Sequence, residues 1–262
     1  MGVELGYKRS LLAVCAGALI LFPALSFGAA SAAPERPTAA KHPVVAIIDS
    51  GIARTPEIGN ALIAEYDMAV KPGRPAFHPR YDHGTMVATI LLREAKQPID
   101  IVSFRIDDLK GCPEGSHPPC QRDVEPIVDA IRKATAIGVS VINISLNLKE
   151  DPRVIDAVHD AAKHGVAVVL AAGNEGLDRP GNLDLARAGF PYTVLVGALD
   201  AYGQPWKGTN RPGASEDGYR YVWQLGVEVP TELADGSQVV ATGTSFAAPI
   251  ETARLVSAPK RI

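Results

Sequence analysis

Short apolar runs rich in β-branched residues alternate along this chain with segments of helical periodicity. The runs cover residues 44–48, 99–106, 139–146, 166–172 and 193–198. The helical segments that lie between them cover 85–95, 124–137 and 153–164. Runs that are apolar throughout are typical of parallel strands buried on both faces. The alternation of strand and helix therefore predicts an α/β fold with a largely parallel sheet.

Glycine and proline mark the expected helix ends. Gly138 and Gly165 follow two helical segments, where a left-handed cap is expected. A last helix is expected from Thr244 to about Val256, and it contains Pro249. We expect Pro249 to fall in the first turn of that helix, where a missing N–H costs little.

The first 32 residues differ in composition from the rest. Lys8 and Arg9 precede an apolar run over 11–27, and Ala-Ser-Ala follows at 30–32. This pattern is typical of a secretory signal peptide that is cleaved after residue 32. A retained membrane anchor is the alternative, but the run is short for a bilayer span and Pro23 interrupts it. The sequence therefore predicts export to a periplasm or the extracellular medium, without stable membrane insertion after cleavage.

The remainder is expected to form one domain over 43–262, after an extended lead-in rich in proline and alanine over 33–42. No internal repeat is visible in it. The formal net charge of the chain is −3, and lysine and arginine form no basic stripe. Nucleic acid is therefore not expected as a partner.

Two cysteines, Cys112 and Cys120, enclose a short segment that contains His117. In an exported chain such a pair is expected to form a disulfide that closes a loop. A zinc site is the alternative, but three ligands at this spacing match no familiar zinc site. We expect a disulfide and no metal.

Four polar residues follow expected strands or begin expected helices: Asp49, His83, Asn174 and Ser245. In open α/β sheets, ligands bind at the carboxyl ends of the strands. A serine at a helix N-terminus lies beside free N–H groups and the positive end of the dipole, which suits a nucleophile whose attack creates an oxyanion. Taken singly, each residue has a structural explanation, such as a helix cap or a turn.

Taken together, the segments that carry these residues resemble the signature motifs of the subtilase family of serine peptidases. The four segments are 47–51, 83–85, 172–174 and 243–249. The order Asp, His, Ser is that of subtilisin and differs from the orders in chymotrypsin and the α/β-hydrolases. The resemblance extends over 43–256, and it implies a three-layer, doubly wound, mainly parallel sheet with helices on both faces.

The resemblance also implies a serine endopeptidase that acts on protein or peptide substrates. Ser245 would attack the scissile carbonyl, His83 would move the proton, and Asp49 would orient His83. Asn174 and the backbone N–H of Ser245 would form the oxyanion hole. The implied substrate-binding residues are Ser145, Leu146 and Asn147 along a strand edge, and Ala171, Ala172 and Gly173 around a side-chain pocket.

The chain departs from the family pattern in several places. About sixteen residues separate the expected cleavage site from Asp49, which leaves no room for a long N-terminal pro-domain, so the protein would fold unaided or use a separate chaperone or activating partner. The helix after His83 passes quickly into the run at 99, where many relatives insert a calcium-binding loop. No cofactor and no tight calcium site are therefore expected. Asn147 stands where relatives commonly have glycine, and the cysteine loop is expected beside the non-prime side of the substrate.

The sequence leaves two functions open besides that of a serine endopeptidase. A non-catalytic relative would only bind peptides or a partner protein. A serine hydrolase specific for esters would share the acyl-enzyme chemistry, and comparing turnover of a peptide amide and its ester distinguishes it from a peptidase.

Overall fold

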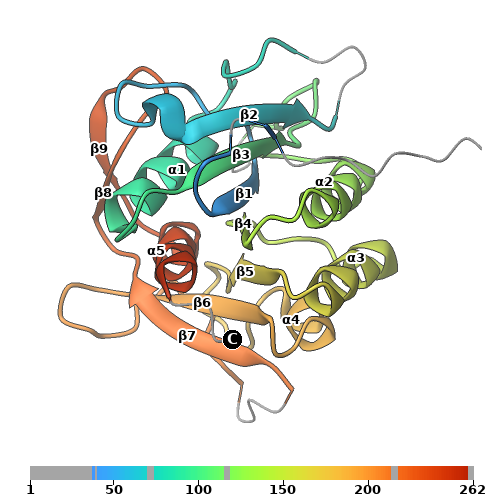
Figure 1. Ribbon diagram of the computed structural model, residues 1–262. Helices are drawn as coiled ribbons and strands as arrows, with labels where there is room; N and C mark the ends of the chain where they lie inside the picture. The colour runs from blue at the N-terminus through green and yellow to red at the C-terminus, as the bar shows by residue number, and fades with distance from the viewer. Residues whose placement is uncertain (1–36, 39, 70–73, 115–118, 214–217, 259–262) are drawn as a thin grey trace, which may run out of the picture. The chain divides into compact units, whose positions relative to one another are not determined.

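A seven-stranded parallel sheet forms the centre of the protein, in the order β2-β3-β1-β4-β5-β6-β7 (Figure 1). This computed structural model describes residues 37–38, 40–69, 74–114, 119–213 and 218–258, so the expected signal peptide and His117 lie outside the described residues. The strands are β1 Val44–Asp49, β2 Leu62–Asp67, β3 Asp100–Arg105, β4 Val141–Ile144, β5 Ala167–Ala171, β6 Thr193–Leu199 and β7 Arg220–Leu225.

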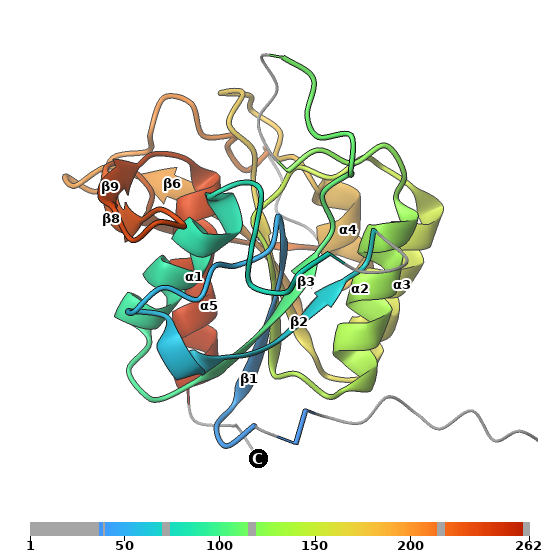
Figure 2. The same cartoon turned by 90° about the horizontal axis from the view of Figure 1, so that it is seen from above.

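Helices cover both faces of this sheet. The first face carries α1 His83–Glu94 and α5 Thr244–Ser257, and the other carries α2 Glu125–Ala136, α3 Pro152–Lys163 and α4 Leu183–Ala188. Figure 2 shows the same separation from a second direction. Successive side chains of β1 alternate between the faces: Ala46 and Ile48 pack in the core with α2 and α3, whereas Ile47 packs in the core with α1 and α5. The predicted three-layer α/β fold is confirmed.

A short antiparallel hairpin of β8 Val229–Glu232 and β9 Gln238–Ala241 packs against α1. The Thr231 hydroxyl donates to the carbonyl of Met86 at 2.8 Å, and the N–H of Ala234 donates to the Asp82 carboxylate at 2.8 Å. A 3-10 turn over Gly59–Ala61 precedes β2. The hairpin therefore supports the N-terminal half of α1.

The five predicted strands correspond to β1 and β3 to β6, and the left-handed caps at Gly138 and Gly165 are confirmed by φ angles of +70° and +72°. The prediction for Pro249 is wrong, because it lies inside α5, as the sixth residue of that helix. The helix begins five residues before the proline, where the side chain of Asn174 accepts the first N–H, that of Thr244. Pro249 therefore leaves the carbonyl of Ser245 without its usual helical N–H partner.

The chain changes direction across the sheet at β1. It first places β2 and β3 on one side of β1, and then β4 on the other. Ligands of such sheets bind where the strand order reverses, at the carboxyl ends of the strands. Asp49 ends β1 at this position. Within the described ranges, no helix is long and apolar enough to cross a membrane.

Candidate active site

Asp49, at the end of β1, faces His83, the first residue of α1. Nδ1 of His83 lies 3.0 and 2.9 Å from the two carboxylate oxygens of Asp49. Asp49 is buried, and its carboxylate also accepts the N–H of Ser50 at 2.7 Å. An ionised carboxylate only accepts, so Nδ1 carries the proton and Nε2 of a neutral His83 is the basic nitrogen.

Gly84 allows this pair to form. A Cβ at position 84 would lie 2.3 Å from the carbonyl oxygen of Gly51 and 3.3 Å from Cβ of Asp49. Only glycine therefore lets the first turn of α1 approach the end of β1 so closely. The Ser50 hydroxyl accepts the N–H of Gly84 at 3.2 Å and joins the two elements.

The environment of His83 acts on its pKa in two directions. Burial lowers the pKa of His83, while the negative charge of Asp49 and the hydrogen bond to it raise that pKa. The net pKa lies above the ordinary value of 6.5. Asp49 therefore stabilises the imidazolium that forms when His83 accepts a proton.

Asn174 is oriented by the start of α5. The N–H and the hydroxyl of Thr244 donate to Oδ1 of Asn174 at 2.9 and 2.8 Å. The Thr244 hydroxyl also accepts the N–H of Gly173 at 3.1 Å, which fixes the end of β5 to α5. Because a backbone N–H can only donate, Oδ1 faces α5, and Nδ2 of Asn174 is available to donate to another group.

A groove of about 890 Å³ brings the expected site residues together. His83, Asn174, Ser245, Ser145, Leu146 and Asn147 all line it. The rings of His83 and Phe246 have centroids 5.6 Å apart, so the start of α5 lies beside His83. The other expected pocket residues, Ala171, Ala172 and Gly173, are buried at the end of β5 and are not among the residues that line the groove.

The groove has further walls that sequence reasoning missed. Tyr81, Gln121 and Trp206 also line it. Tyr81 lies two residues before the motif that begins at His83, and the other two residues lie far from all four motifs in the sequence. Asn182 was also missed, although a Gly-Asn pair before an apolar segment is a helix-start signal. Its side chain forms hydrogen bonds with the segment after β4 and with the end of β5.

The predicted disulfide between Cys112 and Cys120 is present, with a Cα–Cα distance of 5.2 Å. The N–H of Cys112 donates to the Tyr81 hydroxyl at 2.9 Å. Pro119 and Gln121, on either side of Cys120, line the groove. The disulfide loop therefore borders the groove close to the segment that ends in His83.

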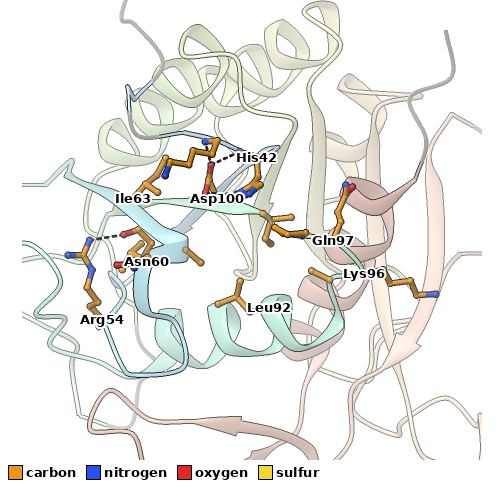
Figure 3. A pocket seen from close by; sticks show the side chains of 14 residues that line it. His42, Arg54, Asn60, Ile63, Leu92, Lys96, Gln97 and Asp100 are labelled. Carbon is orange, nitrogen blue, oxygen red and sulfur yellow. Dashed lines mark hydrogen bonds and ion pairs between the residues drawn. The ribbon is translucent and has the colours of Figure 1, made fainter.

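A second cavity, of about 870 Å³, lies at the amino ends of β1 and β3 (Figure 3). His42 and Asp100 form a pair there, with 3.2 Å between Nδ1 and Oδ1. The described residues that line this cavity include no serine, threonine or cysteine. This cavity lies away from the groove, and its described lining lacks the pairing of a histidine with a serine at a helix start.

Among the residues that the structure describes, no group of three or more His, Cys, Asp or Glu side chains is placed to hold a metal ion. The chemistry of the groove is instead that of a paired Asp and His, a serine at a helix start and an oriented amide.

Comparison with known proteins places this geometry in a wider context. The model of the subtilase family matches residues 40–256. Subtilisin-like protease 2 of Trichophyton equinum is 35% identical over 197 residues, which are 73% of this chain and 43% of that protein. The thermophilic serine proteinase of Bacillus sp. (strain AK1) is 28% identical over 211 residues, which are 78% of this chain and 49% of that protein. The chain spans less than half the length of these relatives.

Solved structures agree on the fold. A cold-adapted subtilisin-like serine proteinase gives a TM-score of 0.63 at 22% identity, covering 79% of this chain and 71% of that one. The prenylagaramide maturation protease PagA gives a TM-score of 0.60 at 21% identity, covering 82% of this chain and 74% of that one. The three-layer architecture is therefore that of subtilisin-like proteins.

Proposed function

The chain belongs to the subtilase family, and we propose that it is an exported serine endopeptidase that works through an acyl-enzyme intermediate. The observation that carries the proposal is the pairing of Asp49 with His83 in a groove that Ser245 and Asn174 also line.

Each group of the groove has a step in this reaction. Oγ of Ser245 attacks the scissile carbonyl carbon while its proton passes to Nε2 of His83. The oxyanion that results accepts hydrogen bonds from Nδ2 of Asn174 and the backbone N–H of Ser245. His83 then gives its proton to the leaving amine, and the acyl group stays bound to Ser245. In the second half of the reaction water attacks the acyl carbon while His83 takes its proton, and His83 then returns the proton to Oγ of Ser245 as the acid product leaves.

The substrate is a protein or peptide in an extended conformation. Ser145, Leu146 and Asn147 leave the end of β4 and line the groove, which supports pairing of the substrate backbone along them. The side chain before the cut enters between this segment and the end of β5, at Ala171, Ala172 and Gly173. Asn147 narrows this entrance compared with the glycine that is common in relatives.

Export is supported by the N-terminal pattern over 1–32 and by the disulfide, since disulfides persist in oxidising compartments. The periplasm and the extracellular medium both fit this reading. A separate chaperone or activating partner stays part of the proposal as the alternative to unaided folding.

The Asp49–His83 pair is already formed, which favours a catalytic protein over a purely peptide-binding one. The test is labelling with a fluorophosphonate probe, which reacts only with an activated serine. Wild type and Ser237→Ala, which removes an exposed serine that does not line the groove, should label equally, and Ser245→Ala should not.

A folded wild type that does not label would overturn the proposal. Labelling together with turnover of esters but not of the matching peptide amides would instead favour the ester hydrolase.

A further inference from the structure

Asn182 is a buried asparagine that the proposed mechanism does not use. It precedes α4 with a left-handed backbone, φ +57° and ψ +18°, and its side chain gives α4 no capping hydrogen bond. An asparagine whose amide is turned away from its own helix has other partners when it is buried.

Those partners are main-chain atoms of two different segments. Oδ1 accepts the N–H of Leu148 at 2.9 Å, and Nδ2 donates to the carbonyl of Leu146 at 2.8 Å. Nδ2 also donates to the carbonyl of Ala171, at 3.0 Å. The N–H of Leu148 can only donate and the two carbonyls can only accept, so the orientation of the amide is determined. One side chain thus joins the segment after β4 to the end of β5.

The residue before it strengthens this connection. The N–H of Gly181 donates to the carbonyl of Ala172 at 2.7 Å. A Cβ at Gly181 would lie 2.9 Å from Oδ1 of Asn147 and 3.2 Å from the carbonyl oxygen of Ala172, so any other residue would require a shift of the Asn147 side chain. The Gly181-Asn182 pair therefore contacts both segments that flank the entrance for the substrate side chain.

We propose that Asn182 is a positioning residue that sets the distance between the 145–148 segment and the end of β5, and so determines which side chain the enzyme accepts before the cut. This inference rests on the proposed function, because the two segments are substrate walls only in a peptidase or peptide-binding protein. Asn182 does not touch the reacting atoms, and its effect is on substrate binding.

Asn182→Asp tests the role with little change of shape. The aspartate still accepts the N–H of Leu148. It cannot donate to the carbonyls of Leu146 and Ala171, so two hydrogen bonds are lost and a negative oxygen faces two carbonyl oxygens. We expect kcat/KM for peptides to fall about tenfold, mainly through KM, and the preference between large and small side chains before the cut to fall by a similar factor. The rate of fluorophosphonate labelling should fall by less, because that probe needs the nucleophile and not the walls.

Two further variants separate positioning from general stability. Asn182→Gly keeps the left-handed backbone and removes all three side-chain bonds, so it should reproduce the loss of preference if Asn182→Asp does not fold. Leu183→Ala leaves a cavity under the same helix and keeps all three side-chain bonds of Asn182, so it should lower the melting temperature and leave the preference unchanged.

Peptide binding in the Ser245→Ala background gives the same preference without turnover. A wild type that neither labels nor cleaves overturns the proposed function. In that case the role of Asn182 is still tested by comparing peptide-binding preference with and without the Asn182 substitutions. Unchanged preference in both Asn182 variants, with a melting temperature lowered as in Leu183→Ala, overturns the positioning role. A wild type with no preference in either assay overturns it as well.

Discussion

At the scale of single residues, the proposed mechanism makes the pair of Asp49 and His83 responsible for the pH dependence of peptide hydrolysis. Only a neutral His83 can take the proton of Ser245, and the carboxylate of Asp49 holds the pKa of His83 above 6.5. Because a higher pKa keeps more of the imidazole protonated at a given pH, peptide hydrolysis should rise with pH through a midpoint above 6.5. The measurement is the pH profile of kcat/KM between pH 5 and pH 9, values chosen as roughly two units on either side of an ordinary histidine.

Asp49→Asn is the matched change for this prediction, since it keeps the shape of the side chain and removes its charge. The midpoint should move to lower pH, and the plateau should fall by roughly 10⁴ because the imidazole is no longer held in the correct tautomer. A midpoint that stays in place in Asp49→Asn would show that another group sets the profile.

At the scale of elements, the disulfide loop forms one border of the groove. Pro119 and Gln121 line the groove, and Cys112 is joined to Tyr81, two residues before His83. Replacing 112–120 with a short Gly-Ser turn removes Pro119 from the lining and the N–H bond to Tyr81. We expect cleavage to become more tolerant of the residues that precede the cut, as measured with a peptide library, while fluorophosphonate labelling is retained.

The matched control opens the loop without shortening it, through Cys112→Ser combined with Cys120→Ser. It should change the preference less than the replacement does, because Pro119 is kept. An unchanged preference after the replacement would contradict a role of the loop in substrate choice.

Which elements could be predicted depended on where each one is buried. The strands found from sequence lie in the sheet interior, where burial on both faces gives a continuous apolar run. Edge strand β2 was missed because Glu65 lies in its middle, buried but satisfied by the N–H groups of Ile52 and Phe77. Edge strand β7 is only partly buried, and α4 has six residues, too few for a helical period.

The site divides in the same way. Asp49, His83, Asn174 and Ser245 stand in short motifs of recognisable type, so the sequence alone predicted that they lie at one site, and the structure brings them to the same groove. Asn182 has only backbone partners, 34, 36 and 11 residues away, and main-chain atoms leave no trace in the residue types. The role that we propose for Asn182 therefore depends on the fold and not on a sequence motif.

At the scale of the whole molecule, Arg74 joins two buried carboxylates that lie at or just beyond the ends of neighbouring strands, Asp67 of β2 and Asp107 after β3. The guanidinium of Arg74 lies 2.8 Å from carboxylate oxygens of both Asp67 and Asp107. Burial raises the pKa of Asp67, whereas the hydrogen bonds and the positive charge of Arg74 lower it. The lowering effects are larger together, so the pKa of Asp67 lies below its usual 3.8. The stability that this ion pair contributes is therefore present above pH 3.8 and is lost as the pH falls through the lowered pKa.

This arrangement predicts a fold that depends on Arg74 and not on calcium. Adding calcium or a chelator should leave the melting temperature of the wild type unchanged, because a protein cation already neutralises these carboxylates. Arg74→Met should lower the free energy of unfolding by about 3 kcal/mol, since it takes away the guanidinium that two buried carboxylates share. Arg187→Met removes the same charge from an exposed pair and should cost less than about 1 kcal/mol. A large rise in melting temperature with calcium that a chelator reverses would show that the protein holds a metal site, and the stability of the segment before His83 would then have to be assigned to that metal.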